Sequence, residues 1–456
     1  MSPHDASPLP KSWDALAPSI ELLGSAAARL PPAASALALP PASSSPAPPR
    51  RIALISDDGA PLGAFDGASD DGQSISLMHL ACELGRAGVA VDIFTRCATP
   101  SGPPVVDLQA GVRVIQVPVG RARHAPRTAL APQVDATTNF LNRFMARFIA
   151  RFITRFARRQ PAMYDLVHAN GHWSGMIAAH LERTLGLPFI LASHRPAKSD
   201  RPATGAVDMQ YPGGVEPARI VALPCGFSPA AFWPVPMREA RDRLRIAAHR
   251  FVVLHAGRMA PHKGIDTLIQ GIARLRQRHD VDAELIVVGG ERASATGQCG
   301  LEQARLHQLA VELGISAHIR FEGARPHPAL RDYYAAADVL ASAPWCGSPG
   351  LAPVEAMACA RVVVATEVGA SKGVVLDGVT GHLVPPRDPE ALAERLASLQ
   401  RQPERARRMG QLGRVRVCEH HTWQRVAQQL NQVYSLLLEQ ARASQPSPFY
   451  FSQESA

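Results

Sequence analysis

The sequence predicts an α/β protein made of two doubly wound parallel-sheet domains that face each other across a cleft. Two series of short hydrophobic segments support this prediction, one in each half of the 456-residue chain. In both series, segments rich in β-branched residues alternate with helical segments, as is typical of parallel sheets covered by helices. The two series are similar in length, which favours two domains of one kind with a site between them.

The first series begins with a predicted strand at residues 51–56. A loop rich in Gly and Asp (57–72) joins it to a helix at 73–87 and a strand at 89–95. This is one strand–helix–strand unit, which implies parallel strands. The other elements predicted in this half are strands at 111–118, 165–168, 188–192 and 219–224 and helices at 139–159 and 175–185. The stretch from 194 to 214 is polar, rich in Pro and Gly, and without periodicity.

The second series follows a linker at 228–236. Its predicted strands are 251–255, 283–288, 318–322, 339–342, 361–366 and 381–384, with helices at 264–279, 301–313, 328–336 and 352–359. A last helix, from 423 to about 441, is long enough to return to the first domain. We therefore expect domains at 50–227 and 237–420, a crossing helix at 421–441, and tails at 1–49 and 442–456. The first tail is rich in Pro, Ala and Ser, a composition typical of disorder.

Composition narrows the class of protein. The chain has no run of about 18 apolar residues, so we expect no membrane-spanning helix. It does not begin with a basic segment followed by an apolar one, so we expect no secretory signal. The seven cysteines are scattered and form no C-x-x-C pair, which indicates reduced thiols in a cytoplasmic protein. The net charge of +9 favours an anionic partner, which could be a sugar nucleotide, an anionic lipid surface or nucleic acid.

The predicted helix at 139–159 has a four-residue repeat of phenylalanine and arginine. The repeating residues are Phe140, Phe144, Phe148, Phe152 and Phe156, with Arg143, Arg147, Arg151, Arg155 and Arg159. On a helix of 3.6 residues per turn the two stripes drift slowly around the axis. One interpretation is a domain helix with a basic outer face, and the other is a helix that lies on an anionic membrane. Nucleic acid is the weakest alternative, because no known nucleic-acid-binding module accompanies the charge.

The stretch from Trp345 to Ala360 predicts a loop that delivers a helix N-terminus at the end of a strand. Pro353 suits a first helical turn. Free backbone N–H groups and the helix dipole would make this N-terminus an anion site. One turn inside, Glu355 could accept hydrogen bonds from the hydroxyls of a sugar. The alternative is an ordinary loop with a solvated Glu355.

A second candidate anion site follows the predicted strand at 251–255. Arg258 and Lys263 lie in the loop that leads to the next helix. A guanidinium fork and an ammonium group both suit phosphate oxygens. The loop is neither a Walker loop nor a dinucleotide fingerprint, because G-x-x-x-x-G-K-[ST] and G-x-G-x-x-G are absent from it. Taken alone, the two cations could be surface charge.

The order of the motifs resembles the donor half of the family-4 retaining glycosyltransferases. They are R-x-x-x-x-K-G at 258–264, V-V-G-G at 287–290, P-W…G-L-x-P-x-E-A-M-A-C at 344–359 and D-G-V-T-G-H-L-V-P-P-R-D-P at 377–389. The amino-terminal half is similar to the same family, near sucrose-phosphate synthase and the inositol-phosphate glycosyltransferase of mycothiol synthesis. Its matching pieces are Asp71-Gly72-Gln73, G-V-R-V-I-Q-V-P at 111–118, H-A-N-G-H-W-S-G at 168–175 and Ser193-His194. The resemblance covers about residues 51 to 440.

The resemblance implies a GT-B fold, with an acceptor-side domain at 50–227 (shortened near 195–218) and a nucleotide-sugar-binding domain at 237–420. It also implies a cytoplasmic enzyme of carbohydrate biosynthesis that transfers a hexose with retention, usually without a metal. In the front-face mechanism proposed for the family, the leaving phosphate deprotonates the acceptor. The protein then needs no nucleophile, only positioning and charge stabilisation.

Roles for single residues follow from the same resemblance. Arg258 and Lys263 would neutralise the departing diphosphate, Asn170 would face the reacting sugar, and Glu355 would bind the ribose. The expected donor-binding residues are Gly72, Gly350, Leu351 and Glu355, and the expected acceptor-side residues are His172, His194 and Lys198.

Several matched positions depart from the family pattern. Gly347 stands where most relatives have a Glu that contacts the donor sugar, and losing such a bond costs roughly 2–4 kcal/mol. Asp66 and Asp71 replace glycines of the amino-terminal loop. A carboxylate within ~4 Å of the diphosphate would oppose it by about 4 kcal/mol at an effective dielectric constant of 20. His172 replaces a Trp of the close relatives, and Ala360 replaces a Gly.

Three hypotheses follow from these observations. The first is a retaining glycosyltransferase that uses a sugar nucleotide. The second is a catalytically weakened or inactive paralogue that acts as a binding or partner subunit. The third is a protein that binds the inner membrane face through the helix at 139–159, and it is compatible with the first.

Overall fold

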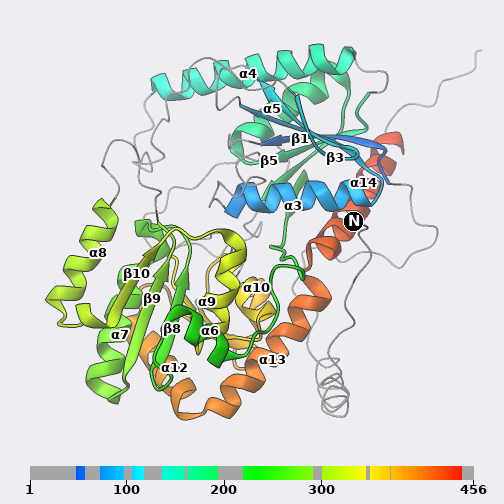
Figure 1. The fold of residues 1–456 in the computed structure, drawn as a ribbon. Helices are drawn as coiled ribbons and strands as arrows, with labels where there is room; N and C mark the ends of the chain where they lie inside the picture. Colours follow the sequence, from blue (N-terminus) through cyan, green and yellow to red (C-terminus); the bar gives the residue numbers. More distant parts are fainter. Residues whose placement is uncertain are drawn as a thin grey trace, which may run out of the picture.

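In the computed structural model, two sheets form two domains, one above the other in Figure 1. The structure describes residues 48–56, 72–96, 105–117, 136–159, 163–193, 219–290, 300–345, 350–369 and 371–443. Nearly all of both expected tails, most of the Gly/Asp-rich loop and the polar stretch after residue 193 lie outside the described residues. The predicted fold class, two facing doubly wound parallel-sheet domains, is confirmed.

The amino-terminal domain contains a seven-stranded sheet in the order β3-β4-β2-β1-β5-β6-β7. The strands are β1 (Arg51–Ser56), β2 (Ala90–Arg96), β3 (Val105–Gln109), β4 (Val112–Val117), β5 (Leu166–Asn170), β6 (Phe189–Ser193) and β7 (Ile220–Ala222). All pairs are parallel except β3 with β4. The sequence analysis missed β3, a partly exposed edge strand. Its alternating residues are shared between solvent and the sheet, so no hydrophobic run marks it.

Helices cover both faces of this sheet. On one face, α4 (Ala136–Arg158) packs against α5 (His172–Leu185), and on the other α3 (Gly72–Arg86) packs against α14 (Trp423–Ala443) (Figure 1). Ala150, Ile153 and Ala157 of α4 are fully buried against the sheet. The apolar stripe of α4 therefore supplies part of the domain core, as the first interpretation of the Phe/Arg repeat predicts.

The carboxy-terminal domain has a six-stranded sheet in the order β10-β9-β8-β11-β12-β13, with all pairs parallel. The strands are β8 (Phe251–Ala256), β9 (Ala283–Val288), β10 (Ile319–Gly323), β11 (Val339–Ser342), β12 (Val362–Thr366) and β13 (Gly381–Val384). The helices are α6 (Met237–Leu244), α7 (Ile265–His279), α8 (Leu301–Glu312), α9 (Leu330–Ala336), α10 (Leu351–Ala358), α11 (Ser371–Val374), α12 (Pro389–Arg401) and α13 (Pro403–His420), with short 3₁₀ turns η3 (Pro261–Lys263), η4 (Ser316–His318) and η5 (His327–Ala329).

In this second domain α7 packs against α12, and the pairs α6–α9 and α10–α13 also pack together. The sequence analysis did not predict α6, α12 or α13. Two further corrections affect the site. The helix expected at 175–185 begins at His172, and the strand expected to end at residue 168 extends to Asn170.

Two chain segments connect the domains and lie side by side. The Phe227 N–H donates to the His421 carbonyl at 2.8 Å, and the Trp423 N–H donates to the Phe227 carbonyl at 3.1 Å. Gly226 has no room for a side chain, because a Cβ atom there would lie 2.4 Å from the Trp423 ring. From this junction α14 returns to the first domain. No helix of the described residues combines the length and the apolar character needed to cross a membrane.

Candidate active site in the interdomain cleft

Arg258 and Lys263 lie beyond the carboxyl end of β8, where the loop is shaped by two glycines. Gly257 has φ +146°, and its carbonyl oxygen would be 2.1 Å from a Cβ atom on Gly289. Gly264 has φ +66° and begins α7, and a Cβ atom there would lie 1.9 Å from the Ala343 carbonyl oxygen. Only glycine tolerates such close backbone approach. The two cations are therefore held at the edge of the sheet where doubly wound folds bind ligands.

Both domains contribute to a small cavity beside Arg258. Its volume is about 60 Å³, and its walls include Ile75 of α3 from the first domain. The second domain contributes Arg258, the Gly289-Gly290 turn after β9, Arg325 and His327. This part of the interdomain cleft therefore combines two arginines, the backbone of three glycines and apolar side chains such as Ile75.

Gly72 and Leu351 meet across the same cleft. A Cβ atom on Gly72, the first residue of α3, would lie 3.2 Å from Cδ1 of Leu351, the first residue of α10. Two expected donor-binding residues from different domains are therefore neighbours. Gly350 is the N-cap residue of α10, so the expected helix N-terminus faces this point of contact.

Glu355 is almost completely buried, with 2% of its surface exposed. Its Oε1 lies 2.7 Å from Nε2 of His327, and the Tyr334 hydroxyl donates to its Oε2 at 2.7 Å. The alternative of a solvated glutamate is therefore wrong. Burial, together with the nearby Glu355 carboxylate, raises the pKa of Tyr334, so its hydroxyl keeps its proton and remains a donor. The His327 ring also packs edge-on against Phe232, with centroids 5.0 Å apart.

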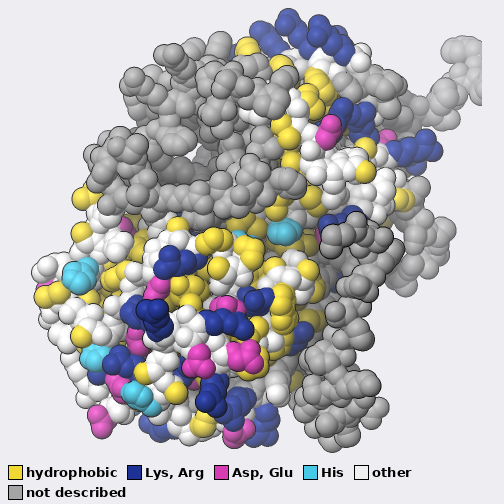
Figure 2. Space-filling model, in the orientation of Figure 1, with side chains coloured by type: hydrophobic (Ala, Val, Ile, Leu, Met, Phe, Trp, Pro, Cys, Tyr) yellow, Lys and Arg dark blue, Asp and Glu magenta, His cyan; other side chains and the backbone are white. Residues whose placement is uncertain are grey.

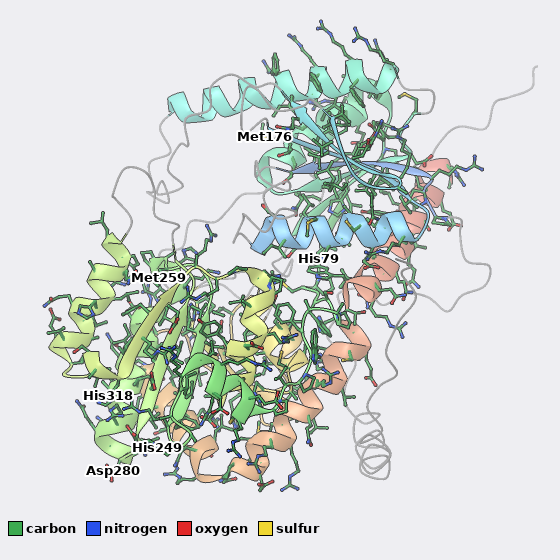
Figure 3. All side chains as sticks on the ribbon, in the orientation of Figure 1. His79, Met176, His249, Met259, Asp280 and His318 are labelled. Atoms are coloured by element: carbon green, nitrogen blue, oxygen red, sulfur yellow. The ribbon has the colours of Figure 1, made fainter. Side chains whose placement is uncertain are left out.

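The electrostatic environment of the cleft disfavours protonated histidine. Burial, followed by the charges of Lys263 and Arg258, lowers the pKa of His262. Burial, followed by His327, lowers the pKa of His79 to about 4. His79 lies on the side of α3 that faces the second domain (Figure 3), where it stacks on Trp423 with centroids 5.7 Å apart. Imidazoles at these positions are neutral at pH 7, so the positive charge comes from arginine and lysine.

Asn170 lies at the carboxyl end of β5, paired in register with Ser56 at the end of β1. It is 8% exposed. The loop that follows β1 leads to Gly72, so Asn170 and Gly72 belong to the same edge of the first sheet. The backbone of His172 begins α5, and nothing is described of its side chain. His194, Lys198, Asp66, Asp71 and Gly347 lie outside the described residues.

The sequence analysis missed His327 and Tyr334, the two partners of Glu355. Their positions in the chain give little signal, because His327 follows β10 in a Pro-flanked turn and Tyr334 looks like a core residue of α9. The usable clue is that a buried carboxylate needs hydrogen-bond donors. Within the described segments, no group of three or more His, Cys, Asp or Glu side chains is arranged to hold a metal ion.

Two facing parallel-sheet domains, with cations and a helix N-terminus at the cleft edge of the second, define a GT-B type transferase. Models of two families match this chain. Residues 236–416 match "Glycosyl transferases group 1", and residues 71–261 match "Glycosyl transferase 4-like domain". D-inositol 3-phosphate glycosyltransferase 1 of Catenulispora acidiphila is 31% identical over 431 residues, covering 86% of this chain and 97% of that protein.

Solved structures agree with this assignment. Sucrose-phosphate synthase of Thermosynechococcus elongatus is 26% identical, with a TM-score of 0.69 over 86% of this chain and 100% of that one. The Anabaena protein Alr3699/HepE, solved with UDP-glucose, shares the fold at 20% identity and a TM-score of 0.59, over 85% of this chain and 99% of that one. The chain belongs to the glycosyltransferase family defined by the group 1 and 4-like domains.

Proposed function

We propose that the protein is a retaining glycosyltransferase that moves a hexose from a nucleoside-diphosphate sugar to an acceptor without a metal. The observation that best supports this proposal is that Gly72 and Leu351 of different domains are neighbours, while Ile75, one turn further along α3, lines the cavity at Arg258. This arrangement brings the expected donor-binding pieces of both domains to one place. The names of the relatives make D-inositol 3-phosphate the first acceptor to test.

In this proposal the reaction needs positioning and charge more than a protein nucleophile. The acceptor oxygen bonds to the anomeric carbon on the face from which the diphosphate leaves, and the leaving phosphate takes the acceptor proton. Arg258 and Lys263 stabilise the charge that develops on the diphosphate. Asn170 faces the reacting sugar, while His172, His194 and Lys198 lie on the acceptor side. Each carboxylate oxygen has two acceptor sites, so Glu355 can bind ribose hydroxyls while it keeps His327 and Tyr334.

Calorimetric titration with UDP, GDP and ADP tests the donor half of the proposal. We expect one diphosphate to bind, and Arg258→Ala or Lys263→Ala to weaken it about tenfold to a hundredfold through loss of a charge-assisted hydrogen bond. Arg401→Ala, at an exposed site on α12, is the matched control and should bind normally. Binding of no diphosphate, or equal loss in the control, would contradict the proposal.

Turnover assays test the second half of the proposal, which is the transfer of the sugar to an acceptor. Wild-type protein is incubated with UDP-glucose, UDP-N-acetylglucosamine or GDP-mannose and with D-inositol 3-phosphate or a lysate of acceptors. We expect product with the anomeric configuration of the donor. An inverted product would refute the retaining mechanism. If no donor of the panel is transferred or hydrolysed, the proposal that the protein is an enzyme is refuted.

The second candidate is a weakened paralogue that acts as a binding or partner subunit. Gly347 favours it, because the sequence has no acid where relatives hold the donor sugar. In that case Gly347→Glu combined with Asp71→Gly should restore sugar-nucleotide affinity by about two to three decades, the equivalent of roughly 2–4 kcal/mol. If the double variant gives the same titration curve as the wild type, Gly347 and Asp71 are not the cause of weakened donor binding.

The outer face of α4 supports attachment to an anionic membrane surface as a further part of the function. Residues 136–158 contain no Asp or Glu, and Arg147, Arg151 and Arg155 are exposed together with Phe148, which is 42% exposed. Figure 2 shows a row of dark blue Lys and Arg side chains along the top of the molecule, where α4 lies in Figure 1. Each such arginine near an anionic bilayer contributes about 1 kcal/mol.

Co-sedimentation with vesicles that contain anionic lipid tests this attachment. The triple variant Arg147→Gln/Arg151→Gln/Arg155→Gln should lose most of the binding. A triple Gln variant at the exposed Arg401, Arg405 and Arg408 of the other domain has the same net charge and should retain it. Failure of the wild type to sediment at low salt would remove the membrane from the proposal.

A further inference from the structure

A large cavity opens at the end of the second sheet that is opposite to the cleft. Its volume is about 750 Å³, within the usual range for small-molecule sites. Phe251, Asp338 and Arg361 line it, and each stands at or just before the amino end of its strand, β8, β11 or β12. Arg258 and Lys263 follow the carboxyl end of β8. The cavity is therefore separate from the candidate active site, with the length of a strand between them.

Two chain segments form the side walls of the cavity. One is the interdomain linker with the start of α6, which contributes Pro234, Val235 and Met237. The other is the turn from α12 to α13, which contributes Leu399, Pro403 and Arg407. The first wall is apolar and the second is mixed. Such a site suits a ligand with a carbon skeleton and a charged group.

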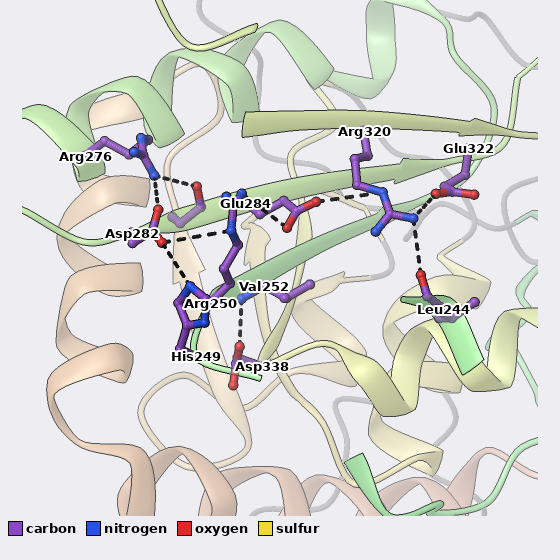
Figure 4. A network of polar contacts seen from close by, with 11 residues as sticks. Leu244, His249, Arg250, Val252, Arg276, Asp282, Glu284, Arg320, Glu322 and Asp338 are labelled. Carbon is purple, nitrogen blue, oxygen red and sulfur yellow. Dashed lines mark hydrogen bonds and ion pairs between the residues drawn. The ribbon is translucent and has the colours of Figure 1, made fainter. Parts of the chain in front are cut away.

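The charged side chains that line the cavity are four arginines and one carboxylate, that of Asp338. Asp338 is already engaged, because its Oδ2 accepts from Arg241 and from the Val252 N–H, both at 2.7 Å. Arg250 lies 3.9 Å from Asp282 and 3.5 Å from Glu284, as part of the polar network in Figure 4. Arg407 pairs with Glu404, and both of these side chains are largely exposed.

Arg361 is the arginine whose charge is least compensated. Its Nε donates to the Tyr334 carbonyl at 3.1 Å and its Nη2 to the Ala335 carbonyl at 2.7 Å. These bonds cap the end of α9, but over the described residues Arg361 makes no ion pair with a carboxylate. Burial lowers the pKa of Arg361, Cys359 and the Asp338 carboxylate raise it, and Arg241 and Arg407 lower it. A partly buried guanidinium that bonds to no carboxylate is costly, and an anion in the cavity would reduce that cost.

We propose that this cavity binds the phosphate ester of a small molecule, with the phosphate on Arg361 and Arg407 and the carbon skeleton on the linker wall. Two guanidinium groups suit a phosphate dianion, because Arg407 is exposed on the rim and Arg361 keeps the N–H groups of Nη1 beside its two bonds to carbonyls. The ligand would contact both the linker and α13, which are the two segments that lead from one domain to the other. Its binding would therefore restrain the two segments that connect the domains.

Calorimetric titration of the full chain with glucose 6-phosphate, inorganic phosphate and glucose tests the site. UDP is present to occupy the donor side of the cleft; because the acceptor side stays open to a phosphate ester, the variants below assign the binding to this cavity. We expect one equivalent of glucose 6-phosphate to bind at least about tenfold more tightly than either fragment. Equal binding of inorganic phosphate would overturn the ester assignment, and no saturable binding would overturn the site.

Variants locate the binding on the cavity. Arg407→Gln removes an exposed side chain on the cavity rim and should weaken glucose 6-phosphate about tenfold or more. Arg408→Gln, next to it but not lining the cavity, is the matched control and should bind normally. Hydrogen exchange should show protection at 234–241 and at 399–411 on binding. Equal loss in both variants, or protection elsewhere only, would overturn the proposal.

Discussion

Glu355 is a buried carboxylate that depends on two neighbouring donors, and this dependence can be measured. Tyr334→Phe leaves Oε2 without its partner in a dry site, so we expect a loss of about 1–3 kcal/mol in the free energy of unfolding. His327→Ala should cost less, because the side chain of His327 is 22% exposed and water can replace it. Denaturant unfolding measures both.

Tyr333→Phe is the matched control for this pair. The Tyr333 hydroxyl also donates to a carboxylate, Oε2 of Glu322 at 3.0 Å. Glu322 keeps Arg320 and Arg325 as partners, so the loss should stay below that of Tyr334→Phe. Equal losses for the two tyrosines would mean that Glu355 is reached by water after all.

Ala360 shows how a single departure from the family pattern acts on the backbone. It has φ +58°, in the left-handed region, which the glycine expected there from the family resemblance would adopt at little cost. The left-handed conformation costs a residue with a Cβ atom roughly 1–2 kcal/mol. The structure therefore gives this substitution a local cost in stability, separate from the chemistry of the cleft.

At the scale of the elements, α14 is held to the first sheet by one buried side-chain bond. The Tyr434 hydroxyl lies 2.5 Å from Nδ1 of His168 on β5, and both residues are fully buried. Tyr434→Phe should therefore cost about 1–3 kcal/mol in the free energy of unfolding without creating a large cavity. Ser435→Ala on the same helix should be nearly neutral, because the Ser435 hydroxyl donates only to its own helix, at Asn431. A neutral Tyr434→Phe would show that packing alone docks α14.

The same elements show what the sequence can predict. Strands Ala283–Val288, Val339–Ser342 and Gly381–Val384 match their predicted bounds, because buried parallel strands are short hydrophobic runs between polar breaks. Helix α12 was not predicted although its start signal is present, since the Asp388 side chain accepts from the N–H groups of Glu390 and Ala391. Helix α13 gives a weaker signal, because arginines interrupt its apolar positions.

The candidate site also has a part that the sequence predicts and a part that it does not. Arg258, Lys263 and Glu355 each belong to a motif that follows a predicted strand. Their place in the fold, beyond the end of a strand, can therefore be predicted from the sequence. The bond between His327 and Glu355 joins residues 28 positions apart through tertiary packing. No local pattern encodes such a contact. The positions of candidate ligands to phosphate could thus be predicted from the sequence, and the second layer that holds Glu355 could not.

On the scale of the whole molecule, the two domains are joined by a shared hydrophobic cluster, and each also has a cluster of its own. A single cluster of buried residues runs from Leu54 of β1 through Trp423 of α14 to Val354 of α10. His255 and His421 are buried, and His79 is half-buried where it stacks on Trp423 of this cluster. Desolvation of these rings therefore couples the stability of the whole chain to pH.

We expect the protein to lose stability as the pH falls from about 6.5 to 4. Burial lowers the pKa of each of these three histidines from 6.5 to about 4 in the folded chain. Between these values the unfolded chain binds more protons than the folded chain, so the free energy of unfolding decreases as the pH falls. For the two most deeply buried, His255 and His421, full protonation of the unfolded chain costs about 3 kcal/mol each. Asp92 and Glu322, whose pKa values are lowered, act mainly below this range.

Denaturant unfolding at several pH values between 7.5 and 4.5 measures this slope. His255→Phe removes one of the titrating rings, so its free energy of unfolding should depend less steeply on pH than that of the wild type. Ile286→Val, a core change with no titrating group, should lower stability by about 0.5–1.5 kcal/mol at every pH and leave the slope unchanged. If His255→Phe keeps the full wild-type slope, the ring of His255 is already protonated in the folded chain or takes up no proton on unfolding, and acid sensitivity must come from other groups.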